Sequence, residues 1–119
     1  MHTLFSSEDK VFAIAGCNST LEWILGYSKK ETDTMSVMVF NTRGIKIAMV
    51  EDVKCEDVNN FAVHCEIMRR EKQYVLSVHF FNMTQSNSEN FTGLLRSATG
   101  GERNVTKELI VTGILSKRC

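Results

Sequence analysis

The side chains with the most distinctive chemistry in this sequence are four cysteines: Cys17, Cys55, Cys65 and Cys119. An even number permits two disulfides, and four sites allow three connectivities, among which sequence alone does not choose. Cys55 and Cys65 flank a turn-prone loop, so that closing this pair needs little chain, and we favour it. Cys17 then pairs with Cys119 if the C-terminal residues fold back, or Cys119 pairs outside this sequence.

Four Asn-x-Ser/Thr sequons form the second distinctive set. They begin at Asn18, Asn82, Asn90 and Asn104. This is more than chance placement of Asn, Ser and Thr gives in a chain of this length, and it predicts N-glycosylation at these positions. Sequons and paired cysteines together indicate the secretory pathway, either the lumen of the endoplasmic reticulum or the cell surface.

No other combination of residues predicts catalysis or cofactor binding. His64 and Cys65 are neighbours whose side chains point to opposite faces of a strand, and neither C-x-x-C nor H-x-x-x-H occurs, so no zinc site is expected. No G-x-S-x-G nucleophile motif is present, and Gly100-Gly101 lacks the Lys-Ser/Thr of a phosphate-binding loop. The sequence therefore predicts a protein that is not an enzyme and has no cofactor.

The length and the charge of the chain further limit the class of protein to which it can belong. The 119 residues suit one domain, 1–119, and the formal net charge of +0 gives no field that favours nucleic acid or anionic lipid. The sequence contains no apolar span of 18 residues that could cross a membrane. Met1–Phe5 is not expected to be a signal peptide. We expect termini trimmed from a larger membrane glycoprotein, with an anchoring segment absent here, and no membrane contact by this fragment itself.

The elements that hold these residues are short strands. In residues 74–81, Tyr74, Leu76, Val78 and Phe80 alternate with side chains of the other face. Similar runs recur at 11–17, 21–25, 36–40, 45–50, 61–67 and 105–115, separated by turn-forming residues. Eight or nine such strands without a convincing helix predict an antiparallel β-sandwich.

The stretch from Val78 to Gly93 resembles the E-strand, corner and F-strand of a variable-type immunoglobulin domain. Its apolar positions match Val78, Phe80 and Met83, and the acidic-Ser corner matches Asn87-Ser88. Phe91 stands where the corner tyrosine is usual, and Gly93 where the second sheet-bridging cysteine is usual. The resemblance therefore implies an all-β, immunoglobulin-like (V-type) antiparallel β-sandwich that lacks the usual B–F disulfide.

Laid onto this fold, residues 11–17 are expected to form strand B and residues 21–25 strand C, which carries Trp23. Residues 36–40 and 45–50 are then expected to form the C′–C″ hairpin, and 61–67 with 74–81 the D–E hairpin. Without the usual cystine, core packing must hold the sheets together. The expected core residues are Trp23, Val78, Phe80, Met83 and Phe91.

The departures from host domains are similar to those of immunoglobulin-like immune-evasion glycoproteins of large DNA viruses. Trp23, the Cys55 and Cys65 pair, and Phe80-Phe81-Asn82-Met83-Thr84 match features of that group. The resemblance to the mouse-cytomegalovirus glycoprotein family implies a non-enzymatic immunomodulatory domain that binds a host immune protein, with MHC class I favoured. The alternative is a host-type adhesion or receptor domain that binds a cognate cell-surface protein. Residues 27–47, which lie in the long sequon-free stretch between Asn18 and Asn82, are the expected interface.

Overall fold

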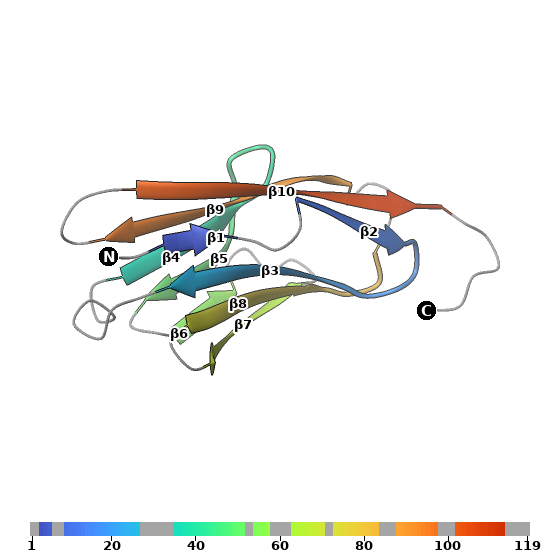
Figure 1. Ribbon diagram of the computed structural model, residues 1–119. Helices are drawn as coiled ribbons and strands as arrows, with labels where there is room; N and C mark the ends of the chain where they lie inside the picture. The colour runs from blue at the N-terminus through green and yellow to red at the C-terminus, as the bar shows by residue number, and fades with distance from the viewer. Residues whose placement is uncertain are drawn as a thin grey trace.

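Two β-sheets face each other in the computed structural model, which describes residues 3–5, 9–26, 35–51, 54–57, 63–70, 73–83, 88–97 and 102–113 (Figure 1). The regular structure in these ranges is entirely strand. The strands are β1 (Thr3–Phe5), β2 (Lys10–Ile14), β3 (Ser19–Gly26), β4 (Met35–Phe40), β5 (Lys46–Glu51), β6 (Lys54–Asp57), β7 (Val63–Arg70), β8 (Gln73–Phe80), β9 (Glu89–Ser97) and β10 (Glu102–Thr112).

The strand order identifies the architecture. One sheet has the order β1-β3-β8-β7 and the other β2-β10-β9-β4-β5-β6. Neighbours are antiparallel, except that β2 runs parallel to β10. This is the variable-type immunoglobulin arrangement, in which strands A, B, E and D face A′, G, F, C, C′ and C″. The predicted V-type sandwich is confirmed.

The strand assignment of the N-terminal half was wrong by one strand. Residues 10–14 form β2, an edge strand beside β10, whereas β3 with Trp23 pairs with β8 and is therefore strand B. Strands β4 and β5, expected as C′ and C″, are C and C′, and C″ is the short β6. The cause was the single tryptophan, because variable-type domains usually carry a buried Trp on strand C.

Trp23 occupies the place between the sheets where the B–F cystine is usual. Its side chain is fully buried and lies against Gly93 of β9, where a Cβ in place of the glycine hydrogen would come within 2.8 Å of the indole Nε1. The indole N–H donates a hydrogen bond to the carbonyl oxygen of Val105 in β10, at 3.0 Å. The glycine therefore makes room for an indole that crosses from one sheet to the other.

A buried lysine adds a second connection between the sheets. Lys107 of β10 is 2% exposed, and its Nζ donates a 2.7 Å hydrogen bond to the carbonyl oxygen of Glu22 in β3. The same ammonium lies 5.7 Å from the centroid of the Trp23 ring, within the range of a cation–π contact. The burial of this lysine was not predicted from the sequence.

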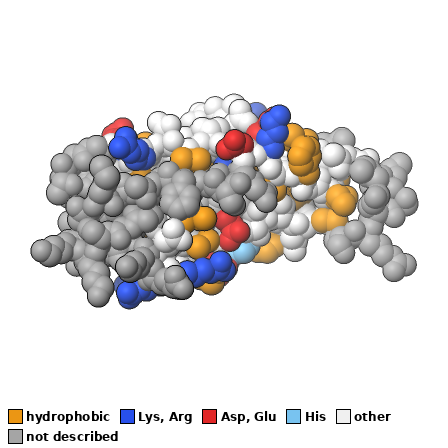
Figure 2. Space-filling model, viewed as in Figure 1, with side chains coloured by type: hydrophobic (Ala, Val, Ile, Leu, Met, Phe, Trp, Pro, Cys, Tyr) orange, Lys and Arg blue, Asp and Glu red, His pale blue; other side chains and the backbone are white. Residues whose placement is uncertain are grey.

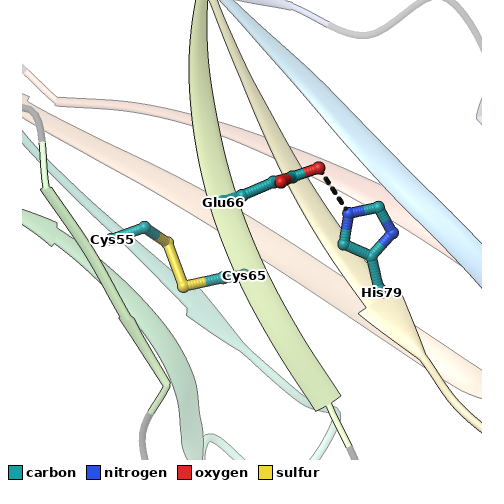
Figure 3. The surroundings of a disulfide bond; sticks show 4 residues. All are labelled: Cys55, Cys65, Glu66 and His79. Carbon is teal, nitrogen blue, oxygen red and sulfur yellow. Dashed lines mark hydrogen bonds and ion pairs between the residues drawn. A yellow bond between two sulfur atoms is a disulfide. The ribbon is translucent and has the colours of Figure 1, made fainter.

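The Cys55–Cys65 disulfide joins the two sheets at the edge that β6 and β7 form (Figure 3). Cys55 lies on β6 of the six-stranded sheet and Cys65 on β7 of the four-stranded sheet, with a Cα–Cα distance of 6.0 Å. Cys17 is also disulfide-bonded. Cys119, its expected partner, lies outside the described residues, and the 17–119 pairing stays a prediction.

The five expected core residues are all buried, each 4% exposed or less. Phe80 and Phe91 pack against each other across the sheets, with ring centroids 5.0 Å apart. Met83 follows β8 and fixes the corner to the β2–β3 turn, because its N–H donates to the Cys17 carbonyl and its own carbonyl accepts from the Gly16 N–H. Gly16 has a φ of 86°, a conformation that favours glycine.

Candidate protein-binding face

The outer surface of the six-stranded sheet carries the most distinctive arrangement of exposed side chains. Strand alternation turns Val37 and Val39 of β4 into the core, so that Met38 and Phe40 point outward. In β9, Phe91 and Leu95 are buried, and Leu94 faces outward with Arg96. Apolar side chains thus lie on the surface that a sandwich normally exposes to solvent.

The strand register aligns these residues into rows. Met38 is directly opposite Leu94 of β9 on one side and Met49 of β5 on the other. Leu94, Met38 and Met49, each half-buried, therefore form a line across three neighbouring strands, which we call the apolar row. Phe40 lies two residues along β4 from Met38 and continues the apolar surface towards the β4–β5 turn.

Charged residues border the apolar row. Arg96 of β9 forms an ion pair with Glu102 of β10, with 3.0 Å between Nε and the carboxylate, and both side chains are more than half exposed. Ser36 lies opposite Arg96, and Glu51 of β5 lies opposite Ser36. An apolar centre with a polar rim is the composition of protein–protein interfaces. An exposed ion pair of this kind contributes little to stability and is available to a partner.

Charges of both signs are interspersed on the surface seen in Figure 2, with hydrophobic side chains exposed between them. This distribution agrees with the formal net charge of +0. Long-range attraction of a polyanion requires a field of one sign. The surface is therefore better suited to short-range apolar and polar contacts.

The outer surface of the four-stranded sheet is different. His79 of β8 forms hydrogen bonds to both neighbouring strands. Its Nδ1 lies 2.8 Å from the Thr20 hydroxyl of β3. Its Nε2 lies 2.9 Å from the Glu66 carboxylate of β7 (Figure 3). The His64 and His79 rings are stacked, with centroids 6.1 Å apart. Ser77 donates to Glu22 at 3.3 Å. These contacts connect the side chains of three adjacent strands to one another.

A hydroxyl, an imidazole and a carboxylate in series can also transfer protons in an enzyme. Here the two partners of His79, Thr20 and Glu66, are on β3 and β7, the strands on either side of β8. The three side chains therefore connect neighbouring strands of one sheet. Among the residues that the structure describes, no group of three His, Cys, Asp or Glu side chains is placed to hold a metal ion.

All four sequon asparagines are exposed. Asn18 and Asn82 lie together at the E–F corner end, where the Asn18 Oδ1 accepts the backbone N–H of Asn82 at 2.9 Å. Asn90 and Asn104 both lie on the outer surface of the six-stranded sheet, and Asn104 is directly opposite Leu94. A glycan at Asn104 would therefore border the apolar row, whereas one at Asn90 would start opposite Glu108, closer to the β4–β5 turn.

The expected interface, residues 27–47, is only partly described. Residues 27–34 lie outside the described ranges, and residues 35–47 include β4, which supplies Met38 and Phe40. Sequence reasoning missed Leu94 and Met49, the other members of the apolar row. The sequence shows that Leu94 and Met49 alternate with apolar neighbours. It does not show which face of each strand is exposed to solvent, because that depends on pairing between distant segments.

No family model matches this chain, and no curated protein matches it. Solved immunoglobulin-like structures do. One, from a study of "multimeric cell-adhesive interactions of VGSC beta subunits", shares 16% identity over 88% of this chain and 92% of the other, with a TM-score of 0.72. Murine CRIg shares 11% identity over 94% and 98%, with a TM-score of 0.71. The RIG-5 IG1 homodimer shares 13% identity over 93% and 97%, with a TM-score of 0.70.

These likenesses show the fold, which is that of an immunoglobulin-like domain. An immunoglobulin-like domain with a disulfide fits an extracellular or secreted location. Within the described ranges there is no helix long and apolar enough to span a bilayer.

Proposed function

We propose that this chain is a non-enzymatic adhesion or receptor domain that binds a cognate cell-surface protein through the outer surface of its six-stranded sheet. The observation that carries the proposal is the apolar row of Leu94, Met38 and Met49 on an exposed sheet surface. Its burial against a partner would be favourable, at about 25 cal/mol per Å² of apolar surface removed from water.

The structural likenesses support this reading over the viral one. One similar structure is described as taking part in cell-adhesive interactions, and another forms a homodimer. A partner that is itself a cell-surface protein, including a second copy of this chain, is therefore the first to examine. On this proposal the domain is displayed at the cell surface by an anchoring segment outside this sequence.

Binding to MHC class I by a viral immune-evasion glycoprotein is the second candidate. It is favoured by the loss of the B–F cystine, since Trp23 and Gly93 occupy its place, and by four exposed sequon asparagines. These features indicate divergence and glycan shielding, but a fast-diverging host domain would share them. A panel of binding partners that includes MHC class I distinguishes the two candidates.

The test presents the chain to a panel of cell-surface ectodomains that includes MHC class I and the chain itself. Met38→Arg is the diagnostic variant, and Met68→Arg is its matched control, because Met68 is 39% exposed on β7 of the other sheet. A charge in the centre of an interface costs more than about 1.4 kcal/mol, which weakens binding at least tenfold.

We expect binding to at least one ectodomain that Met38→Arg weakens and Met68→Arg leaves unchanged. Binding that survives Met38→Arg and is lost with Met68→Arg would place the interface on the four-stranded sheet. Capture of MHC class I alone would favour the viral candidate.

A further inference from the structure

A groove on the outer surface lies where the β4–β5 turn meets the start of β9. Its volume is about 590 Å³. The lining residues used below are Thr42, Arg43, Glu89, Asn90, Glu108 and Ile110, and we call this the hairpin groove. Asn90 is the only sequon asparagine among the residues that line it.

The turn that forms one wall is held in place by its own hydrogen bonds. Asn41 accepts the backbone N–H groups of Arg43 and Ile45 through its Oδ1, both at 3.0 Å, and its carbonyl accepts from the Gly44 N–H. Gly44 has a φ of 76°, which completes the turn without strain. The wall is therefore formed before any ligand arrives.

Thr42 fastens this turn to β9. Its hydroxyl accepts the Asn90 N–H and donates to the Asn90 carbonyl, both at 3.1 Å, and its own N–H donates to the Glu89 carboxylate at 2.9 Å. The backbone of Asn90 is thus fixed among the residues that line the groove. Its exposed carboxamide, the group that a glycan would modify, starts from a defined position.

We infer that Asn90 carries an N-linked glycan whose first sugar residues lie in the hairpin groove. The groove offers hydrogen-bonding groups of mixed sign: the Arg43 guanidinium and the carboxylates of Glu89 and Glu108. Ile110 adds an apolar surface. The charges at the groove balance, because Arg43 lines it and Lys10 lies 4.0 Å from the Glu108 carboxylate, so no excess of positive charge favours a phosphate or nucleic acid. A neutral sugar presents hydroxyl and amide groups to either charge and C–H groups to the isoleucine.

Covalent attachment makes this placement more favourable. A tethered ligand meets its site at a high effective concentration, so that contacts too weak to hold a free sugar suffice. The glycan would cover the hairpin end of the outer surface. The apolar row lies further along the strands, at Leu94 and Met38, and the inference holds whether or not that row binds a partner.

The test uses the chain secreted from a glycosylating host, with site occupancy measured by peptide mass spectrometry. The glycans are trimmed to one N-acetylglucosamine, and backbone hydrogen exchange and NMR shifts are compared with those of Asn90→Gln. Asn104→Gln is the matched control, because Asn104 shares the surface and lies opposite Leu94, outside the groove lining.

We expect occupancy at Asn90, several-fold slower exchange at Arg43 and Ile110 than in Asn90→Gln, and no such change at these residues in Asn104→Gln. If Asn90→Gln is poorly secreted, the whole glycan is removed enzymatically from the folded chain, which leaves an aspartate at position 90, and the trimmed chain is compared with that product. An unmodified Asn90 overturns the inference. So does a modified Asn90 whose groove residues exchange as they do without sugar.

Discussion

Replacing Gly93 with alanine tests the inter-sheet role of Trp23. The added Cβ would lie 2.8 Å from the indole Nε1, 3.0 Å from Cδ1 and 3.1 Å from Cε2. The indole has no free path away, because it is fully buried and donates its N–H to Val105. Overpacking of this kind costs about 1–3 kcal/mol, and disturbance of the hydrogen bond adds about 1 kcal/mol.

The expected loss of unfolding free energy is therefore about 2–4 kcal/mol. At about 4 °C per kcal/mol for a domain of this size, the Tm of Gly93→Ala should fall by about 8–16 °C. Thermal and urea unfolding followed by circular dichroism measure both quantities. Fluorescence gives an independent signal in the Gly93 variant, because Trp23 is the only tryptophan of the chain.

The control is the same change in a Trp23→Phe background, where the atom nearest to the new Cβ is absent. The two changes should then be non-additive, with a coupling free energy above about 0.5 kcal/mol. A Gly93→Ala variant with an unchanged Tm, or strictly additive effects, would refute this reasoning. Either result would mean that the indole and the glycine do not depend on each other.

Three further predictions concern the other contacts between strands and sheets. Paired Cys55→Ser and Cys65→Ser changes should lower the unfolding free energy by about 2–4 kcal/mol in non-reducing urea titrations, and no change would argue against a stabilising disulfide. Lys107→Met keeps the side-chain length but removes the charged hydrogen bond to Glu22, so calorimetry should show a loss of about 1.5–3 kcal/mol; an equal or higher Tm would contradict this. His79→Phe removes two hydrogen bonds, each contributing about 0.5–1.5 kcal/mol, and should cost about 1–3 kcal/mol, whereas Thr20→Val removes one and should cost less; the opposite order would show that the network is not centred on His79.

The fold class was predictable because its evidence is local. Val78, Phe80, Met83 and Phe91 lie within one short stretch, and their spacing reports the E-strand, the corner and the F-strand directly. The alternation of buried and exposed side chains in a strand depends only on the period of two. The presence of the strands could therefore be predicted from the sequence. All five expected core residues are buried.

The strand assignment failed because it depended on a contact between distant residues. Trp23 and Gly93 are 70 positions apart, and nothing in the sequence near either shows that one fills the space left by the other. Once Trp23 was placed on strand C, the preceding run had to become strand B. The structure places that run at the edge of the other sheet, beside β10.

The apolar row could not be predicted from the sequence for the same reason, since it depends on contacts between distant residues. Leu94, Met38 and Met49 form a row only through the β9–β4 and β4–β5 registers, and an error of one residue in either would turn a member into the core. The β9–β10 pairing likewise places the two sequon residues Asn90 and Asn104 on that one surface, opposite Glu108 and Leu94 respectively.

Hydrogen exchange of the chain with and without its partner would locate the binding surface on one sheet or the other. The experiment uses whichever ectodomain the binding panel identifies and compares the backbone of β4, β5 and β9 with that of β3, β7 and β8. We predict slower exchange around Met38, Met49 and Leu94 in the complex and unchanged exchange around Met68. Protection confined to the four-stranded sheet, with the apolar row unaffected, would contradict the proposed binding face.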